Sequence, residues 1–424
     1  MSTATRRSSN SNGADVHILF LSDNFPPEVN APASRTFEHC REWVRAGEQV
    51  TVITCAPNFP KGKVLEGYRN SPWKSEMVEG IRVIRVWSYI TANEGFLKRV
   101  LDYLSFMFSA TIASLFVRKV DVVVGTSPQF FTACAACAVG ILKRRPWVFE
   151  LRDLWPESIK AVGAMKDSPA IRLLERIEMF LYRRADRIVS VTHSFKDALI
   201  RRGIDGSKIG IITNGVDLAH FQPGPKDAAL SRELGLDGCY IAGYVGTHGM
   251  AHGLETLLDA AATLQQTPDA ADIRFLFLGN GAQKAALVER SRELGLRNVL
   301  FVDSVPKSEV SRYWSLLDLS VIHLRKNELF NSVIPSKMFE CMAMGIPVLH
   351  GVAGESADIL RREDVGAAFE SGNAEQLVQA LLSLRRDPVR HARYRANGPT
   401  AAQKYDRKDL ASRMLAILKT LEPR

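Results

Sequence analysis

The sequence has few cysteines, and none of them lies in a pattern that would bind a metal ion. The six cysteines in 424 residues fall mostly in apolar runs, which favours a reducing cytosol. Cys134 and Cys137 have the spacing of a redox or metal pair. However, they lie in an Ala-rich stretch without a second ligand pair, so we interpret them as buried structural residues. We therefore expect no metal site and no bound cofactor.

We expect the first residues not to form a secretory signal, and we find no nucleic-acid-binding pattern in the sequence. Residues 1–15 are polar, rich in Ser and Asn, and have no apolar core, so we expect a flexible tail. The net charge is +9, but no basic cluster is interleaved with aromatic residues, and nucleic acid is not an expected partner. A charged fraction of 24% and an apolar fraction of 46% are typical of a globular chain.

Long apolar runs are scarce as well, and the longest one is interrupted by a charge. Residues 100–117 form an apolar run that contains Asp102 and several hydroxyl side chains, which argues against a transmembrane span. Basic residues flank this run and the next apolar stretch; they are Lys98, Arg99, Arg118, Lys119 and residues 143–145. We interpret the run as a core helix partly exposed to an anionic membrane surface. A fully buried helix explains it as well.

Strand-like and helix-like stretches alternate from residue 16 onward. Several strand-like runs are continuously apolar, which is typical of parallel strands covered by helices on both faces. The first series comprises 16–22, 49–54, 81–86, 120–124, 147–151 and 187–191; the second comprises 209–213, 240–245, 273–278, 299–302, 319–322, 348–350 and 367–369. Two successive βαβ blocks predict two Rossmann-like, doubly wound α/β domains that face a cleft at the carboxyl ends of their strands.

Turn residues mark the expected domain boundary. They gather between residues 205 and 226, where one domain would end and the next begin. The predicted divisions are a tail at 1–15, an N-terminal domain at 16–205, a C-terminal domain at 206–404 and a final helix at 405–424.

A short segment in the second half carries the clearest chemical signal. Pro335 can start a helix. The next three amides, of Ser336, Lys337 and Met338, would form a helix N-terminus that attracts a phosphate, and the lysine adds a full charge. Glu340 follows one turn later, where its carboxylate could accept both hydroxyls of a ribose. An exposed Ser-Lys-Glu face on an ordinary helix explains the segment about equally well.

Six short motifs follow one another in order along the chain. They are Phe-Pro-Pro-Glu at 25–28 with Arg35 downstream, Asn-Phe-Pro-Lys-Gly at 58–62, Arg-Asp-Leu-Trp-Pro-Glu-Ser at 152–158, Asn-Gly-Val-Asp at 214–217 with Phe221, Gly-Thr-His-Gly at 246–249, and the segment 335–347. This ordered set resembles the GT-B retaining glycosyltransferases of family 4. The closest resemblance is to the bacterial cell-surface polysaccharide subgroup typified by N-acetyl-L-fucosamine transferases.

The resemblance implies a fold and an activity. The fold would be GT-B, with an N-terminal acceptor-binding domain, a C-terminal nucleotide-sugar-binding domain, and a last helix that packs back on the first domain. The activity would be retaining, metal-independent transfer of a hexose-type sugar, in which the leaving phosphate takes the acceptor's proton. The donor would be a UDP-linked N-acetylated amino or deoxy sugar, and the acceptor a glycan on polyprenyl diphosphate.

The subgroup also implies a cellular role. Its members serve O-antigen (lipopolysaccharide), capsule or exopolysaccharide synthesis. They are cytoplasmic enzymes held peripherally at the inner leaflet of the cytoplasmic membrane.

On the donor side, the sequence both matches and departs from the family pattern. Glu340 corresponds to the second glutamate of the family's E-x7-E element, but Ser332 stands where the first would be. The usual Arg/Lys pair on the diphosphate would fall near Thr247 and His252, so it is absent too. The residues expected to bind the donor are Gly246, Thr247, His248, His252, Arg325, Lys326, Pro335, Ser336, Lys337, Met338 and Glu340.

In the first domain, Arg152 takes the place of the family's frequent catalytic-face histidine. Asp153 and Glu28 are the carboxylates expected beside the reacting sugar or the acceptor, although each could instead cap a helix or pair with an arginine. The acceptor side is expected at Asn30, Ser34, Arg35 and Trp155.

Two other functions share this fold. A sugar-nucleotide epimerase of the same fold would need acid and base carboxylates and no lipid acceptor. A non-catalytic nucleotide-binding partner of a polysaccharide assembly complex would explain the missing glutamate and the missing Arg/Lys pair.

Overall fold

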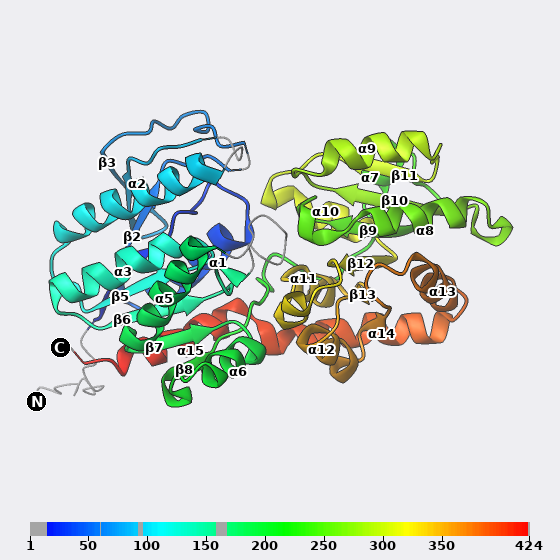
Figure 1. Ribbon diagram of the computed structural model, residues 1–424. Coiled ribbons are helices and arrows are strands. Elements are labelled where there is room, and N and C mark those ends of the chain that lie inside the picture. Colours follow the sequence, from blue (N-terminus) through cyan, green and yellow to red (C-terminus); the bar gives the residue numbers. More distant parts are fainter. Residues whose placement is uncertain (1–14, 60, 92–95, 158–167, 423–424) are drawn as a thin grey trace, which may run out of the picture.

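The computed structural model describes residues 15–59, 61–91, 96–157 and 168–422, which form two α/β domains around two separate sheets (Figure 1). Most of the expected tail, residues 1–14, lies outside the described residues, as do Pro60 and Ser158 of two motifs. Each sheet has buried apolar side chains on both faces. The predicted class of two doubly wound, Rossmann-like α/β domains is confirmed.

The first sheet has eight strands in the order β3-β4-β2-β1-β5-β6-β7-β8, and all pairings except that of β3 are parallel. The strands are β1 (His17–Leu21), β2 (Gln49–Cys55), β3 (Trp73–Val78), β4 (Ile81–Val86), β5 (Val122–Thr126), β6 (Trp147–Leu151), β7 (Arg187–Ser190) and β8 (Ile209–Ile211). The helices of this domain are α1 (Ala31–Arg45), α2 (Phe96–Leu115), α3 (Phe130–Lys143), α5 (Pro169–Arg184) and α6 (His193–Arg201).

The first sheet differs from the prediction at both edges. Strand β8 pairs with β7, so the run 209–213, which we assigned to the second series, belongs to the first sheet. The boundary expected after residue 205 was therefore placed too early. Strand β3 is antiparallel to β4 and was not predicted, because its residues alternate between exposed and half-buried positions, whereas the parallel strands are continuously apolar.

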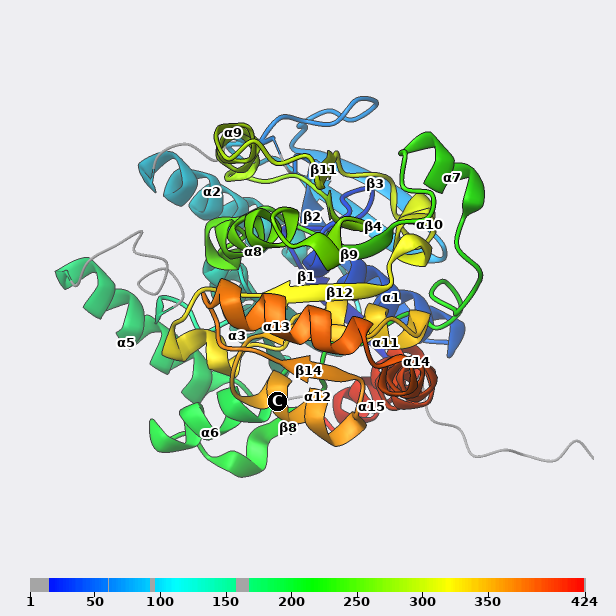
Figure 2. The same cartoon turned by 90° about the vertical axis from the view of Figure 1, so that its right-hand side faces the viewer.

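The second sheet has six parallel strands in the order β11-β10-β9-β12-β13-β14. They are β9 (Tyr240–Val245), β10 (Ile273–Leu278), β11 (Val299–Val302), β12 (Leu319–His323), β13 (Val348–Gly351) and β14 (Gly366–Ala368). Its helices are α7 (Ala228–Glu233), α8 (Glu255–Gln265), α9 (Lys284–Glu293), α10 (Lys307–Leu316), α11 (Lys337–Met344), α12 (Glu355–Glu363), α13 (Ala374–Arg385) and α14 (Pro388–Ala402). Seen from this domain's side, α8 and α13 lie in front of β9 and β12 (Figure 2).

The last helix, α15 (Arg407–Lys419), returns from the second domain to the first (Figure 1). Its apolar face packs into the core beneath β1 and α1, through residues that include Leu410 and Met414. The indole nitrogen of Trp43 in α1 donates a 2.8 Å hydrogen bond to the carbonyl of Ala411. The expected return of the C-terminal helix to the first domain is thus confirmed.

Two connections between the domains lie side by side. Val216 and Asp406 form a parallel bridge, and the amide of Val216 donates to the carbonyl of Tyr405 at 3.0 Å. A Cβ atom on Gly215 would lie only 2.2 Å from that carbonyl oxygen. The absence of a side chain at Gly215 therefore allows the two backbones to cross this closely.

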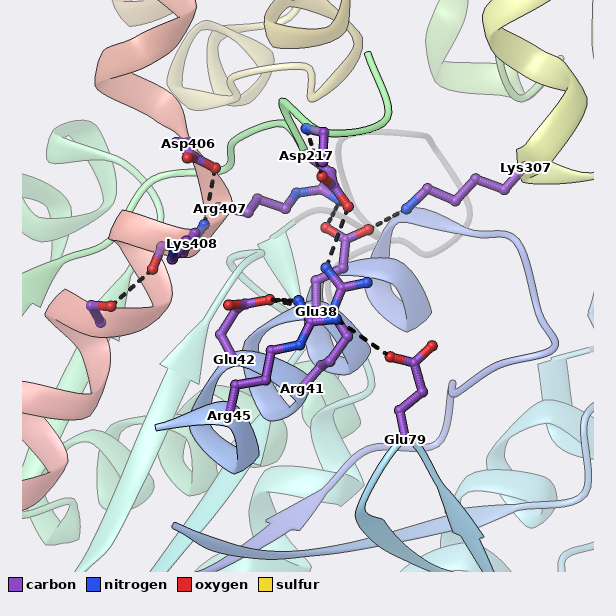
Figure 3. Close-up of polar contacts among 12 residues, drawn as sticks. Glu38, Arg41, Glu42, Arg45, Glu79, Asp217, Lys307, Asp406, Arg407 and Lys408 are labelled. Carbon is purple, nitrogen blue, oxygen red and sulfur yellow. Dashed lines mark hydrogen bonds and ion pairs between the residues drawn. The ribbon is translucent and has the colours of Figure 1, made fainter. Parts of the chain in front are cut away.

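An ion network at the crossing joins the domains (Figure 3). Glu38 of α1, with 2% of its side chain exposed, pairs with Lys307 of α10 and with Arg407 of α15. Arg41, also in α1, pairs with Asp217 in the linker at 3.4 Å. Burial raises the pKa of Glu38, but Arg407 and Lys307 outweigh it, so the pKa is lowered overall. The carboxylate is therefore charged, and its partners come from both sides of the domain boundary.

A second contact between the domains involves a helix N-terminus. The carboxylate of Glu355, in the first turn of α12, accepts the amides of His193 and Ser194 at 3.0 and 2.8 Å and the hydroxyl of Ser194 at 2.8 Å. These donors open α6 of the first domain. An anion at this position suits the unpaired amides and the dipole of α6.

Among the residues that the structure describes, no helix is both long enough and apolar enough to cross a membrane. Helix α2 is nevertheless apolar on its outer side. Phe108 and Ile112 are 62% and 59% exposed, and Phe116, just beyond the helix, is 70% exposed.

The return of α15 makes a prediction about stability. Replacing Leu410 with Ala removes a side chain from the shared core, and we expect the free energy of unfolding to fall by about 2–5 kcal/mol. Ser412→Ala, on the exposed side of the same helix, is the control and should change it by less than about 0.5 kcal/mol. Denaturant unfolding measures both. Equal effects of the two changes would contradict the packing described for α15.

Candidate functional site

Strand β9 ends in a glycine-rich loop that lies against the start of α11. Gly246 adopts a φ of 136°, and a Cβ atom at this position would lie 2.9 Å from the ammonium nitrogen of Lys337. A side chain here would be both strained and in collision. The expected proximity of the loop and the lysine is thus observed, and the glycine leaves the space that Lys337 occupies.

The ammonium of Lys337 is buried and has no hydrogen-bond partner within the described chain. Its nitrogen lies 3.6 Å from the ring centroid of Tyr244, over the ring face. Burial lowers the pKa of Lys337 to about 7, although Cys341 and Glu340 counteract part of that effect. A buried cation with only a ring as neighbour has unused capacity to bind an anion.

Glu340 lies in α11, three residues after Lys337, and is half-buried. Burial raises its pKa, while Arg407, Lys307 and Lys337 act in the opposite direction. Arg407 also affects the pKa of Arg152 in the first domain. Glu340 therefore lies near the crossing of the domains, where ligand hydroxyl groups could reach it.

The N-terminus of α11 offers fewer free amides than expected. The amide of Met338 donates to the carbonyl of Pro335 at 3.0 Å, so it is already used. This is a correction to the expectation for Met338. The described chain provides no acceptor for the amides of Ser336 and Lys337, which stay available to a ligand.

The rings of the two histidines of the loop lie beside the ring of Tyr244. His248 is fully buried, 5.8 Å from Tyr244 and 6.2 Å from Phe277 between ring centroids. Burial lowers the pKa of His248 to about 4 and that of His252 to about 3, so both are neutral. Aromatic rings enclose His248, and neither of its ring nitrogens has a hydrogen-bond partner among the described residues, so its contact with the donor stays a prediction.

Arg325 and Lys326 are already paired with carboxylates of their own domain. Arg325 contacts Glu255 at 2.6 Å, and Lys326 contacts Glu370 at 2.7 Å. Both side chains line a cavity of about 510 Å³ at the carboxyl ends of β12, β13 and β14. Both cations thus have carboxylate partners in this structure, and their expected contact with a diphosphate stays a prediction.

A second cavity, of about 660 Å³, lies between the domains and is lined by residues of both. Ser332, at the position of the family's first glutamate, lines this cavity, and its hydroxyl donates to the carbonyl of Leu329 at 2.6 Å. Glu328 lines both cavities and is exposed. It is thus the carboxylate in this loop that can face a ligand in the cleft.

The hydroxyl group of Ser127 holds the start of the motif that follows β6. Ser127 Oγ accepts the amides of Arg152 and Asp153 at 2.8 and 3.2 Å. Burial lowers the pKa of Arg152 to about 10, and its Nε atom has no acceptor among the described residues. Arg152 therefore keeps its charge and one unused donor.

Glu28 is buried and held by one oxygen. Its Oε1 atom accepts the amides of Asn58 and Phe59 at 2.7 and 2.9 Å, whereas Oε2 has no partner in the part of the chain described. Burial raises the pKa of Glu28 to about 7, that of neighbouring Asp23 to about 6, and that of Asp102 to about 7. Such a group can exchange a proton near neutral pH.

Three of the four residues expected on the acceptor side have structural roles. Asn30 caps α1 by accepting the amide of Ala33 at 2.8 Å. Arg35 is buried and binds Glu150 at 2.8 Å and the carbonyls of Ile212 and Thr213 at 3.0 and 2.6 Å.

Trp155 stacks on Phe130 with ring centroids 4.7 Å apart. Asn30, Arg35 and Trp155 thus serve the fold, whereas the fourth residue expected on the acceptor side, Ser34, is half-buried in the first turn of α1.

Sequence reasoning missed Tyr244, Glu38 and Glu355. Tyr244 looked like one more apolar residue of a buried strand, and Glu38 like an ordinary charged residue of a helix. Glu355 could have been noticed as an acidic residue at a helix start, but its partner helix lies 161 residues away. Within the ranges described, no group of three or more His, Cys, Asp or Glu residues has a metal-binding arrangement.

Comparison with protein families matches each domain separately. The family described as "Glycosyl transferase 4-like domain" matches residues 30–215, and "Glycosyl transferases group 1" matches residues 240–387.

Two curated relatives agree with this. The chain is 28% identical over 343 residues to the "Putative colanic acid biosynthesis glycosyl transferase WcaI" of Escherichia coli, covering 78% of this chain and 82% of that protein. It is 26% identical over 260 residues to the "Probable glycosyltransferase WbjE" of Pseudomonas aeruginosa, covering 61% and 63%.

Solved structures share the whole architecture. Sucrose-phosphate synthase from Thermosynechococcus elongatus has a TM-score of 0.75 at 18% identity, covering 96% of this chain and 98% of that one. Alr3699/HepE of Anabaena, solved with UDP-glucose, has a TM-score of 0.72 at 18% identity, covering 96% and 100%. The chain is therefore a glycosyltransferase of GT-B fold, with a glycosyl transferase 4-like domain followed by a glycosyl transferases group 1 domain.

Proposed function

We propose that this chain is a retaining, metal-independent glycosyltransferase of bacterial cell-surface polysaccharide synthesis. It moves an N-acetylated amino or deoxy sugar from UDP to a glycan on polyprenyl diphosphate at the inner face of the cytoplasmic membrane. The observation that carries the proposal is the buried, unpaired ammonium of Lys337 beside Gly246, one helical turn before Glu340. This arrangement offers a cation to a diphosphate and a carboxylate to a ribose.

The relatives support the donor and the pathway. The name of one curated relative refers to colanic acid biosynthesis, and Alr3699/HepE was solved with UDP-glucose. The proposed subgroup, that of N-acetyl-L-fucosamine transferases, rests on the ordered set of motifs.

The chemistry needs a stabilised leaving group. In the proposed mechanism the acceptor hydroxyl attacks the anomeric carbon on the face from which UDP departs. The bond from that carbon to the phosphate oxygen breaks as the new glycosidic bond forms, and the acceptor's proton passes to the departing phosphate. The protein's contribution is electrostatic and positional. Lys337 and the amides of Ser336 and Lys337 would face the diphosphate, and Arg152 and Asp153 the reacting sugar.

The proposal also assigns a role to Glu28. Its free oxygen atom and its pKa near 7 would allow it to orient the acceptor hydroxyl. The carboxylate is fixed through its other oxygen by two amides, so the free one has a defined direction.

The membrane surface is proposed at the carboxyl ends of α2 and α3. Lys143 at the end of α3 donates to the carbonyl of Val117 at 2.8 Å, which joins the two ends. Exposed apolar side chains gather there and basic ones surround them; they are Phe108, Ile112, Leu115, Phe116, Ile141 and Leu142 with Arg118, Lys119 and Arg144. Apolar insertion and attraction to anionic lipid would act together on this surface.

An inactive nucleotide-binding partner is the second candidate. It is favoured by Ser332 at the position where the family has a glutamate. Nucleotide binding without any release of UDP in the presence of donor sugars and bacterial membranes would favour this candidate over the transferase.

The donor site is tested first by calorimetric titration of UDP, GDP and ADP. We expect UDP to bind, and Glu340→Ala to weaken it by about 1.5–3 kcal/mol, because a charged hydrogen-bond acceptor is lost. Glu233→Ala, on the exposed surface of α7, is the control and should bind as the wild type does. If Glu340→Ala also binds UDP like the wild type, Glu340 does not hold the ribose.

The membrane surface is tested by sedimentation with vesicles. We expect the protein to bind phosphatidylglycerol-containing vesicles, with weaker binding as salt rises. The double change Phe108→Ser and Ile112→Ser should reduce the bound fraction strongly, while Val389→Ser, exposed on α14, should not. Equal binding by all three proteins would rule out this surface.

A further inference from the structure

Tyr244 contacts both elements of the donor site at once. Its ring face lies 3.6 Å from the ammonium nitrogen of Lys337. Its hydroxyl donates a 2.8 Å hydrogen bond to the carbonyl of Thr247, in the loop that follows β9. The side chain is 1% exposed, so solvent does not compete for either contact. One buried residue thus links the position of the cation with the path of the loop.

The space around the ammonium is shaped for this contact. Gly246, between Tyr244 and Thr247, has no side chain, and a Cβ atom there would approach the ammonium to 2.9 Å. Lys337 therefore lies between the glycine backbone and the tyrosine ring. The ammonium has no hydrogen-bond acceptor within the described chain, so the face of the Tyr244 ring is the group that holds it in place.

Among the described residues, no carboxylate pairs with the ammonium of Lys337. On α11, Glu340 and Cys341 favour the charged form from a distance, and Cys341 is buried with a raised pKa. Across the loop, His248 and His252 are neutral, because burial lowers the pKa of each far below neutrality. A ring face stabilises an ammonium more weakly than an anion does.

We propose that Tyr244 is a positioning residue for the donor's diphosphate. Its ring holds the ammonium of Lys337 ready, and its hydroxyl fixes the loop whose backbone the diphosphate must approach. This inference rests on the proposed function, since it takes the ligand of this site to be a nucleoside diphosphate. It adds a residue that acts through Lys337 and does not itself touch the ligand.

The arrangement predicts that the protein takes up a proton when UDP binds. The pKa of Lys337 is near 7 in the free protein, and a diphosphate beside it raises that pKa. At pH 8 the free lysine is mostly neutral and the bound one charged, so UDP binding takes up close to one proton. UDP affinity should fall as pH rises above about 7, because the proton must be supplied on binding.

The test is a double-mutant cycle with UDP, measured by calorimetry at pH 8 in two buffers of different ionisation enthalpy. We expect Lys337→Met to weaken UDP about 10- to 100-fold and to abolish proton uptake. Tyr244→Leu should weaken UDP about tenfold. In the Tyr244→Leu background, Lys337→Met should cost much less than it does alone, since the two side chains act as a unit.

Two variants separate positioning from a loss of folding. Tyr244→Phe keeps the ring and loses the hydroxyl, so it should retain proton uptake and the coupling to Lys337. Tyr240→Leu is the matched control, because Tyr240 lies on the same strand with its ring 5.8 Å from the guanidinium carbon of Arg385, away from the loop. Its combination with Lys337→Met should be additive. Melting temperatures show that each variant is folded.

Each outcome has a distinct meaning. Additive costs for Tyr244→Leu and Lys337→Met, with UDP bound by the wild type, would overturn the positioning role and leave the proposed function intact. Proton uptake that persists in Lys337→Met would place the titrating group elsewhere and overturn the inference as well. A wild type that binds no nucleoside diphosphate would contradict the proposed function and the inference together.

Discussion

The architecture depends on a carboxylate that the first domain cannot satisfy by itself. Glu38 is buried in α1, and its two cations come from α10 of the second domain and from α15. Burying a charge without a partner costs several kcal/mol, so α1 is stable in this environment only when the chain has crossed the boundary twice. The placement of the domains is thereby tied to the folding of the first one.

The two sides of the site use charge differently. On the donor side the structure keeps a cation unpaired, which leaves capacity for a ligand. On the first domain the charges are mostly used within the protein, as with Arg35, whose guanidinium ties β6 to the segment after β8. Glu28 and Arg152 nevertheless each retain an atom without a hydrogen-bond partner in the described chain, and so does Glu150. The likeness to solved structures extends over both domains, so this asymmetry lies within a common fold.

The fold could be predicted from the sequence wherever a strand is buried along its whole length. The runs 147–151, 240–245 and 273–278 are strands with the predicted bounds, because both faces of a parallel sheet require continuous apolar residues. Residues 209–211 were assigned to the wrong sheet, since a short edge strand does not indicate which neighbour it pairs with.

The candidate site could be predicted only in part, because some of its residues depend on partners that are distant in the sequence. Gly246, Lys337 and Glu340 occur in local patterns with local physical meaning. Tyr244 and Glu38, in contrast, acquire their roles from partners far away in the sequence. Asn30 shows the opposite error, because a polar residue at a helix start serves the helix as readily as it serves a ligand.

The side-by-side linkers at Val216 and Asp406 restrict how the domains can move. The two linker segments are joined by this bridge, and the close approach at Gly215 leaves no room for one segment to slide over the other. Stretching the domains apart would break this bridge, whereas twisting about its line would not. Such a twist would instead separate Glu355 from the amides that open α6, so the bridge and this second contact together resist both motions.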